Sequence, residues 1–245
     1  MQVTADKKEL VKKLQAKINA MQGLGKLSER LPETALAPFA GAFPGRVFPS
    51  GAIHEFISYE PAEAASTNGF ISSLAGKFMK EDGLCLWIGN SRKVFPSGLK
   101  YFGLEPDRIV FVTTSKSKDL LWIIEEALKC ESLTAVVGEV KELSFTESRR
   151  LQLAVEQSGI PCFIHRHQPY RENAVACTTR WKISTLPSMT SDGLPGVGNS
   201  CWDVQLLKVR NGRPGYWQIS WTNGNFISLP EQDNLNISLT ERHTG

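Results

Sequence analysis

The residues best suited to chemistry by type and spacing lie in the stretch EFISYEPAEAASTNGF, which runs from Glu55 to Phe70. A β-branched and aromatic strand passes here through a short turn into a helix, and nucleotide-binding α/β proteins place their phosphate loop at such a junction. The partial positive charge at the start of the helix favours an anion, and the hydroxyl groups of Ser66 and Thr67 stand roughly where Mg²⁺ would be held. The turn is therefore the first place to look for phosphate chemistry.

The other residues of the turn oppose a triphosphate. No lysine is present to neutralise phosphate charge, and Gly69 comes too late to let backbone amides curl around phosphate oxygens. Glu60 and Glu63 follow Tyr59 and add negative charge, and two carboxylates about 5–6 Å from a triphosphate oppose binding by several kcal/mol. We interpret Tyr59, both glutamates and the two hydroxyl residues as a degenerate phosphate loop, in which the acids complement the helix dipole.

Two further positions bear on phosphate chemistry. The carboxylate that holds the metal normally ends the strand seen here as TAVVGEV, but that position is Gly138, and Glu139 lies one residue out of register. The strand LCLWIGNSRK should precede a glutamate that activates water, yet it offers Asn90 and Ser91. His54, within the strand AIHEF, is interpreted as a core or edge histidine. Because three requirements fail together, we predict no ATP hydrolysis, no catalytic residue, no metal site and no cofactor.

The elements that position these residues alternate from residue 52 to about residue 165. Strands are predicted at 52–57, 84–89, 108–113, 133–138 and 160–165, and helices at 63–80, 97–102, 118–129 and 145–158. The last helix opens with the capping box Ser144-x-x-Glu147. Short strands that are apolar on both faces and alternate with helices indicate a doubly wound α/β fold, with a mostly parallel sheet and helices on both faces.

Past residue 170 the pattern alternates with a period of two residues. ACTTRWKISTL, CWDVQLLKVR and GYWQISWT predict antiparallel strands, joined by the loop PSMTSDGLPGVGNS and the tight turn NGRPG. These strands are expected to extend the same sheet. One face of their core is predicted to hold Trp181, Trp202, Trp217 and Trp221.

The chain is accordingly divided into four parts. These are an N-terminal amphipathic helix with its linker at 1–42, the α/β core at 43–170, the antiparallel extension at 171–229 and a polar tail at 230–245. In the helix, predicted over 5–22, Leu10, Leu14 and Ile18 fall on one face, and lysines cover much of the rest. This helix either packs against the body of the protein or docks on a partner.

The bulk composition fits a globular protein of the cytoplasm. The 245 residues can bury one sizeable core, and no apolar run reaches the ~18 residues that a membrane span needs. The N-terminus lacks the apolar centre of a secretory signal. The five cysteines are odd in number and widely spaced, which is typical of a reduced compartment. A net charge of +3 is too small to indicate nucleic-acid binding by itself.

Several of these segments resemble a known family. The stretch from FPSGAIHEF to LCLWIGN resembles the opening of the RecA core, and LTAVVGEVKELSFTESRRLQLAVEQSGIPCFIHR looks like the strand–helix–strand unit of the SulA/ImuA group. CWDVQLLKVRNGRPGYWQISW is similar to the segment that ends ImuA proteins. The resemblance spans roughly residues 43–222, and the part beyond 170 favours ImuA because SulA proteins are shorter. It implies a RecA-like fold.

The resemblance also implies a function. ImuA proteins act in SOS-inducible mutagenesis as accessory factors for synthesis past damaged bases, beside ImuB, a homologue of the Y-family polymerases. SulA instead inhibits cell division by binding the tubulin-like division protein, and this is the alternative function. A third alternative is an ATP-dependent DNA-binding relative of RecA.

Three surfaces are candidates for contacts with partners. The first holds Lys208, Arg210 and Arg213 in KVRNGRPG, where residues 208 and 210 of a strand point the same way. Such cations often only protect a sheet edge. RecA, however, carries two lysines two residues apart on the strand that these positions resemble, and they reach the ATP of the neighbouring subunit. The resemblance therefore implies that this chain caps a RecA filament.

The second surface is HRHQPYREN, residues 165–173, which follows the fifth core strand where RecA has a DNA-contacting loop. Arg166, His167, Tyr170 and Arg171 combine charge with an aromatic ring, which suits single-stranded DNA. The third surface is the N-terminal helix, which by analogy with RecA would dock on RecA or on a second copy of this chain.

Overall fold

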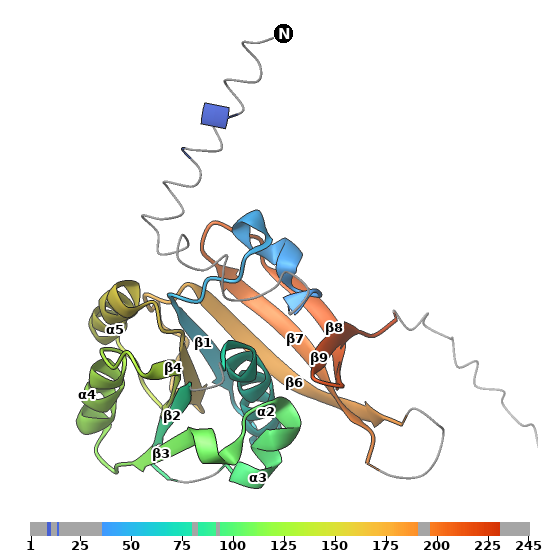
Figure 1. Cartoon of the computed structure of the whole chain (residues 1–245), viewed down its shortest axis with the longest axis horizontal. Coiled ribbons are helices and arrows are strands. Elements are labelled where there is room, and N and C mark those ends of the chain that lie inside the picture. The colour runs from blue at the N-terminus through green and yellow to red at the C-terminus, as the bar shows by residue number, and fades with distance from the viewer. Residues whose placement is uncertain are drawn as a thin grey trace, which may run out of the picture.

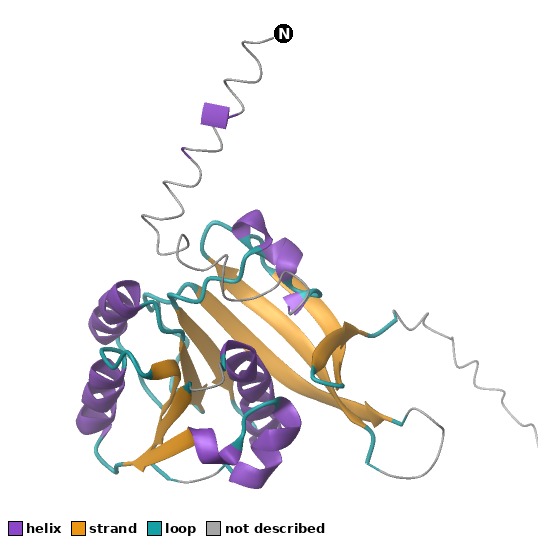
Figure 2. Cartoon of the chain, viewed as in Figure 1, coloured by secondary structure: helices purple, strands orange, loops and turns teal. Residues whose placement is uncertain are grey.

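A computed structural model gives the structure of residues 9–10, 14, 36–79, 83–91, 94–190 and 197–230, which form a nine-stranded sheet with helices packed against it (Figures 1 and 2). The strands are β1 (Ile53–Ser58), β2 (Leu84–Gly89), β3 (Ile109–Thr113), β4 (Leu133–Val140), β5 (Cys162–His167), β6 (Thr179–Met189), β7 (Asn199–Val209), β8 (Gly215–Thr222) and β9 (Asn225–Ser228). The helices are α2 (Pro61–Phe78), α3 (Pro96–Leu99), α4 (Ser117–Ala127) and α5 (Phe145–Ser158). Short 3₁₀ turns form η2 (Ala40–Ala42), η3 (Pro44–Arg46), η4 (Lys100–Phe102) and η5 (Pro106–Arg108).

The strand order is β3-β2-β4-β5-β1-β6-β7-β8-β9. The first six strands in this order run parallel to one another, and β6 to β9 pair antiparallel. The parallel strands bury residues on both faces, as their continuous apolar sequences require. The predicted fold, a RecA-like α/β sheet extended by C-terminal antiparallel strands, is confirmed.

One face of the sheet carries an aromatic core beneath α2 and the segment that contains η2 and η3. The Phe39 ring lies 5.2 Å from that of Trp217, 5.3 Å from Phe226 and 5.7 Å from Trp181. Trp202 and Trp221 are buried in the same cluster, while Trp217 packs against it. The prediction that the C-terminal tryptophans share one face of the core is therefore confirmed.

The other face is covered by α4 and α5, which pack on β1, β2 and β4. Helix α5 begins with the predicted capping box, in which Ser144 Oγ accepts a hydrogen bond from Glu147 N at 3.2 Å and Glu147 Oε2 accepts one from Ser144 N at 2.8 Å. It ends at Gly159, whose φ of 73° permits the left-handed cap.

The connection from β5 to β6 contains no helix and crosses the face that α5 covers. Val175 and Cys177 of this crossover segment, residues 168–178, are buried in the core with α5. The crossover segment, whose start overlaps the predicted DNA-contacting residues 165–173, is therefore in part a core element. Its burial follows from topology, because β6 pairs parallel to β1 and the chain must return across the sheet before β6 begins.

The ends of the chain lie mostly outside the described residues. Of the predicted N-terminal helix, Leu10 and Leu14 are described; both are helical and more than half exposed, at 58% and 51%. Ile18 lies outside the described residues, as does the polar tail from residue 231. Within the described part of the chain, no helix is long and apolar enough to span a membrane.

Candidate functional site

The turn before α2 is already capped by an anion, the carboxylate of Glu63 in the first turn of the helix. Its Oε2 accepts hydrogen bonds from the backbone N–H of Tyr59 at 2.9 Å and from that of Glu60 at 3.4 Å. Pro61 takes the first helical position, where a missing N–H costs nothing. A side-chain carboxylate thus accepts the hydrogen bonds of the amides at the positive end of the helix, where a phosphate loop would place phosphate oxygens.

Two residues of β6 complete the surroundings of this carboxylate. Lys182 Nζ lies 3.8 Å from Glu63 Oε1, and Ser184 Oγ donates a hydrogen bond to the same oxygen at 3.4 Å. Burial alone would raise the pKa of Glu63, but the hydrogen bonds from the Tyr59 and Glu60 amides and the charge of Lys182 outweigh it and lower the pKa. The carboxylate is therefore held ionised. Sequence reasoning missed Lys182 and Ser184 because the pairing of β6 with β1 is not visible in the pattern.

The hydroxyl groups of Ser66 and Thr67, which stand where a phosphate loop would hold Mg²⁺, have other surroundings here. Ser66 Oγ forms a hydrogen bond with Thr185 Oγ1 of β6 at 2.7 Å. The Thr67 side chain is wholly buried, and its Oγ1 has no hydrogen-bond partner among the described residues. Tyr59, also of this loop, directs its hydroxyl to Glu172 Oε1 at 2.7 Å, and its burial and this hydrogen bond raise its pKa to about 12. These three hydroxyls therefore share no hydrogen-bond partner among the described residues.

A polar network fills the space between the carboxyl ends of β1 and β5. Ser58 Oγ lies 2.8 Å from His165 Nε2 and 3.2 Å from His167 Nδ1, and His165 Nδ1 lies 2.8 Å from Asn68 Oδ1 of α2. Serine, histidine and amide thus follow the order of a hydrolytic triad. Ser58 is wholly buried, however, so its hydroxyl is not accessible to a substrate, and the network ties α2 to the sheet.

The strand that normally carries the metal-binding carboxylate differs in a way that packing explains. A Cβ atom at Gly138 would lie 2.4 Å from Ile124 Cδ1 of α4 and 3.2 Å from Ile164 Cδ1, so a side chain there would require these isoleucines to shift. The neighbouring carboxylate of Glu139 accepts a hydrogen bond from Trp87 Nε1 at 2.8 Å. It therefore links the neighbouring strands β2 and β4.

Comparison of the sequence with known proteins assigns the chain to a family. No family model matches the chain. The chain is 30% identical to Protein ImuA of Caulobacter vibrioides strain NA1000 / CB15N over 189 residues, which cover 72% of this chain and 78% of that protein. Protein ImuA of the strain ATCC 19089 / CIP 103742 / CB 15 matches with the same figures. The chain belongs to the ImuA family.

This ImuA-family chain contains a buried charge network that the sequence patterns did not reveal. Glu55, in the middle of β1, accepts hydrogen bonds from Arg166 Nη1 at 2.9 Å and from Arg180 Nε at 2.6 Å. The Arg166 side chain is wholly buried and also donates to the carbonyl oxygen of Arg171 at 3.1 Å. Arg166 is therefore not a surface contact residue, and that prediction is wrong. A glutamate inside the apolar strand AIHEFI was the available signal, because a buried charge requires a partner.

The rest of the predicted DNA-contacting segment is divided between surface and interior. Tyr170 is 81% exposed and Arg171 is also exposed, whereas His167 is half-buried against Ser58. The Tyr170 ring lies 4.0 Å from Lys141 Nζ and borders a cavity of about 270 Å³ at the carboxyl ends of β2, β3 and β4. Within residues 165–173 the exposed side chains are Gln168, Tyr170, Arg171 and Glu172, and Lys141 lies beside the Tyr170 ring.

The basic residues near the end of β7 also differ in their surroundings. Lys208 Nζ donates a hydrogen bond to the Val175 carbonyl oxygen at 3.1 Å, so this cation is bound to the crossover segment. Strand β7 ends at Val209, and the register shifts between β6 and β7 just before Lys208. Arg210 and Arg213 lie beyond the strand and are exposed. The alternation that would place Lys208 and Arg210 on one face applies within a strand, and this strand ends between them, at Val209.

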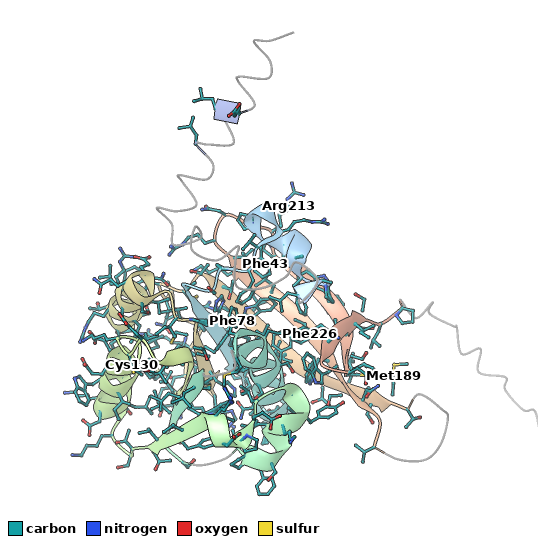
Figure 3. The ribbon with its side chains drawn as sticks, in the orientation of Figure 1. Phe43, Phe78, Cys130, Met189, Arg213 and Phe226 are labelled. Carbon is teal, nitrogen blue, oxygen red and sulfur yellow. The ribbon has the colours of Figure 1, made fainter. Side chains whose placement is uncertain are left out.

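The basic turn, which contains Arg210 and Arg213, and the acidic turn, which contains Glu60 and leads to Glu63, lie at opposite ends of the strands. Val209 pairs with Thr179, which pairs with His54 near the start of β1, while Glu63 follows the end of β1. The backbone N–H of Arg213 also donates to the Ala42 carbonyl oxygen at 2.9 Å, which fixes the basic turn against η2 (Figure 3). The ImuA-family chain thus presents exposed arginines at the opposite end of the strands from the turn that Glu63 caps.

Proposed function

We propose that this chain is a non-catalytic accessory protein in SOS-inducible mutagenic translesion DNA repair, acting in the cytoplasm through contacts with an ImuB-like homologue of the Y-family polymerases. Membership of the ImuA family supports the repair role. The observation that carries the non-catalytic role is the carboxylate of Glu63, which occupies the two amides that a phosphate would need. A nucleotide would have to displace an ionised group that Lys182 already neutralises.

The primary experiment measures binding of the purified chain to two immobilised proteins from the same organism, its ImuB-like protein and its tubulin-like division protein. Binding to the ImuB-like protein alone is the expected result. Binding to the division protein alone would overturn the proposal in favour of the SulA-like alternative. A parallel titration with fluorescent Mg-ATP tests the third alternative, and saturable binding at micromolar nucleotide would contradict a nucleotide-independent role.

RecA is a second candidate partner, and the position of the basic turn favours it. Arg210 and Arg213 are exposed at the end of the strands opposite to the degenerate phosphate loop. The chain would then supply cations to nucleotide held by a RecA subunit without holding nucleotide itself, and would cap the filament. An Arg210→Ala/Arg213→Ala variant is expected to lose binding to ATP-loaded RecA, whereas the exposed Arg149→Ala on α5 serves as the control. Equal binding by both variants would contradict the cap.

Single-stranded DNA is a third candidate, supported by the exposed ring of Tyr170 beside Lys141 and Arg171. A Tyr170→Ala/Arg171→Ala variant is expected to bind a labelled oligonucleotide more weakly than the control Tyr216→Ala, and parental binding should weaken as salt increases. Affinity that does not depend on salt would argue against phosphate contacts. For the N-terminal helix, deletion of residues 1–22 should remove RecA binding or self-association and leave the core folded.

A further inference from the structure

The hairpin of β6 and β7 extends beyond the rest of the sheet. β1 pairs with β6 only as far as Lys182, and β8 pairs with β7 only from Cys201 onward. Among the described strands, the end of β6 therefore pairs with β7 alone, and Figure 1 shows the two strands reaching past their neighbours. We call the described residues 186–190 and 197–199 the hairpin arm.

The hairpin arm lies in a segment with almost no charge. Between Lys182 and Asp203 the sequence contains a single charged side chain, Asp192, where the 22% average of the chain would give about four. Depletion of charge is the compositional mark of the buried centre of a protein–protein interface. A phosphate backbone would instead require cations, so the arm does not suit nucleic acid.

Apolar side chains of the arm are exposed to solvent. Met189 is 50% exposed and Val197 is fully exposed, and Figure 3 shows Met189 away from the body of the sheet. Methionine adapts its shape to irregular apolar surfaces, which suits an anchor residue. Gly198 lets the two strands approach, because a Cβ atom there would lie 2.2 Å from the Met189 carbonyl oxygen.

The base of the arm is braced against the aromatic core. Tyr101 directs its hydroxyl to Asn199 Oδ1 at 3.4 Å and to the Trp221 carbonyl oxygen at 3.2 Å. Trp221 Nε1 in turn donates to the Tyr101 carbonyl oxygen at 2.9 Å. The arm is thus held in a defined direction before any partner binds, which reduces the entropy that binding would cost.

Pro187 determines how the arm can engage a partner. It lies in β6 beyond the point where β1 pairs, and it has no backbone N–H to donate to an additional strand. Addition of a strand at this edge is therefore disfavoured. Insertion of side chains into a groove does not require this N–H.

We propose that the hairpin arm inserts Met189 and Val197 into an apolar groove of the partner protein, which under the proposed function is the ImuB-like protein. The inference rests on that function for the identity of the partner. It assigns the contact to a surface separate from the basic turn, the Tyr170 surface and the N-terminal helix.

The test compares three full-length variants in binding to the purified ImuB-like protein. Met189→Asp and Val197→Asp place a charge at exposed positions and should each weaken binding by at least about tenfold. Ile227→Asp is the matched control, because Ile227 is 47% exposed on β9 and lies outside the arm. Gly198→Ala changes the shape of the arm without adding charge, and it should also weaken binding. Thermal unfolding checks that every variant is folded.

The outcomes separate the two proposals. If the parent does not bind the ImuB-like protein, the proposed function fails. If the parent binds and the arm variants match the Ile227→Asp control, the arm is not the contact and the inference fails. If ultracentrifugation finds a dimer that Met189→Asp dissociates, the arm is seated in a second copy, and the inference is likewise overturned.

Discussion

Arg166 donates a hydrogen bond to Glu55 at 2.9 Å, and both side chains are wholly excluded from solvent. The two residues lie on adjacent parallel strands, and Arg180 of β6 approaches the second oxygen of the same carboxylate at 2.6 Å. One buried acid thus joins three neighbouring strands of the sheet. Its charge has no water to stabilise it, so the two arginines must do so.

Arg166→Met should destabilise the chain by roughly 3–5 kcal/mol, because it removes one of the two cations that balance a buried carboxylate. Arg150→Met is the control, since it breaks the exposed pair with Glu125 and should cost at most about 1 kcal/mol. Urea unfolding followed by circular dichroism measures both. Losses of similar size would mean that the buried pair contributes no more than a surface pair.

Gly138→Ala should destabilise the chain by about 1–3 kcal/mol, because the new methyl group would overpack the side chains of Ile124 and Ile164. At Gly98 a Cβ atom would meet no neighbouring atom within 4 Å, so Gly98→Ala should cause no loss of stability. Thermal unfolding of the two variants tests the contrast. A harmless Gly138→Ala would show that α4 can move away and leave room for a side chain.

His54 should make the chain sensitive to acid. Burial lowers its pKa from the ordinary 6.5 to about 3. Between these two pH values the unfolded chain binds a proton at His54 and the folded chain does not. Stability from this residue is therefore complete above pH 6.5 and is lost as the pH falls toward 3. Between pH 7.5 and pH 5 the loss should be roughly 2 kcal/mol.

His54→Phe should flatten this part of the pH profile, because a phenylalanine ring cannot titrate. The new ring should keep the stacking on Phe48, whose centroid lies 4.3 Å from that of His54 in the parent. Free energies of unfolding at pH 7.5, 6 and 5 measure the difference in slope. The lost hydrogen bond to Thr179 adds only a constant cost. Parallel profiles for parent and variant would show that His54 does not cause the acid sensitivity.

Glu63→Ala should cost about 1 kcal/mol of stability and expose an anion site. The change frees the amides of Tyr59 and Glu60 beside Lys182, so inorganic phosphate should raise the Tm of the variant but not that of the parent. Glu147→Ala removes the equivalent capping residue of α5 and should lose similar stability without a response to phosphate. A phosphate response in both variants, or in neither, would contradict the role assigned to Glu63.

The parts of the fold that local pattern determines were predictable from the sequence. The apolar strands, the Ser144 capping box and the tryptophan face each depend on residues close in the chain or on a repeat of the pattern. The acidic turn was also readable, since Glu60 and Glu63 stand where a phosphate loop needs other residues. Local chemistry therefore predicted the sheet and singled out this turn, whose interpretation as a degenerate phosphate loop stays a prediction.

The contacts that distinguish this site join residues far apart in the sequence. Glu55 meets Arg166 and Arg180 across 111 and 125 positions, and Lys182 reaches Glu63 only because β6 lies beside β1. A pattern with a period of two residues shows which face a side chain takes, but it does not show which strand lies next to it. Arg166 was misplaced for this reason, because its sequence neighbours are polar while its spatial neighbours are a buried acid and the crossover segment.

The contacts of Phe39 with Trp217 and Phe226 have a consequence for biosynthesis. Phe39 completes its packing only after β8 and β9 have left the ribosome. At ordinary translation speeds, synthesis from Phe39 to these strands takes on the order of ten to forty seconds. During that interval the nascent polypeptide exposes an apolar aromatic surface that is prone to aggregation. A product that stops before β8 should therefore aggregate or be held by chaperones.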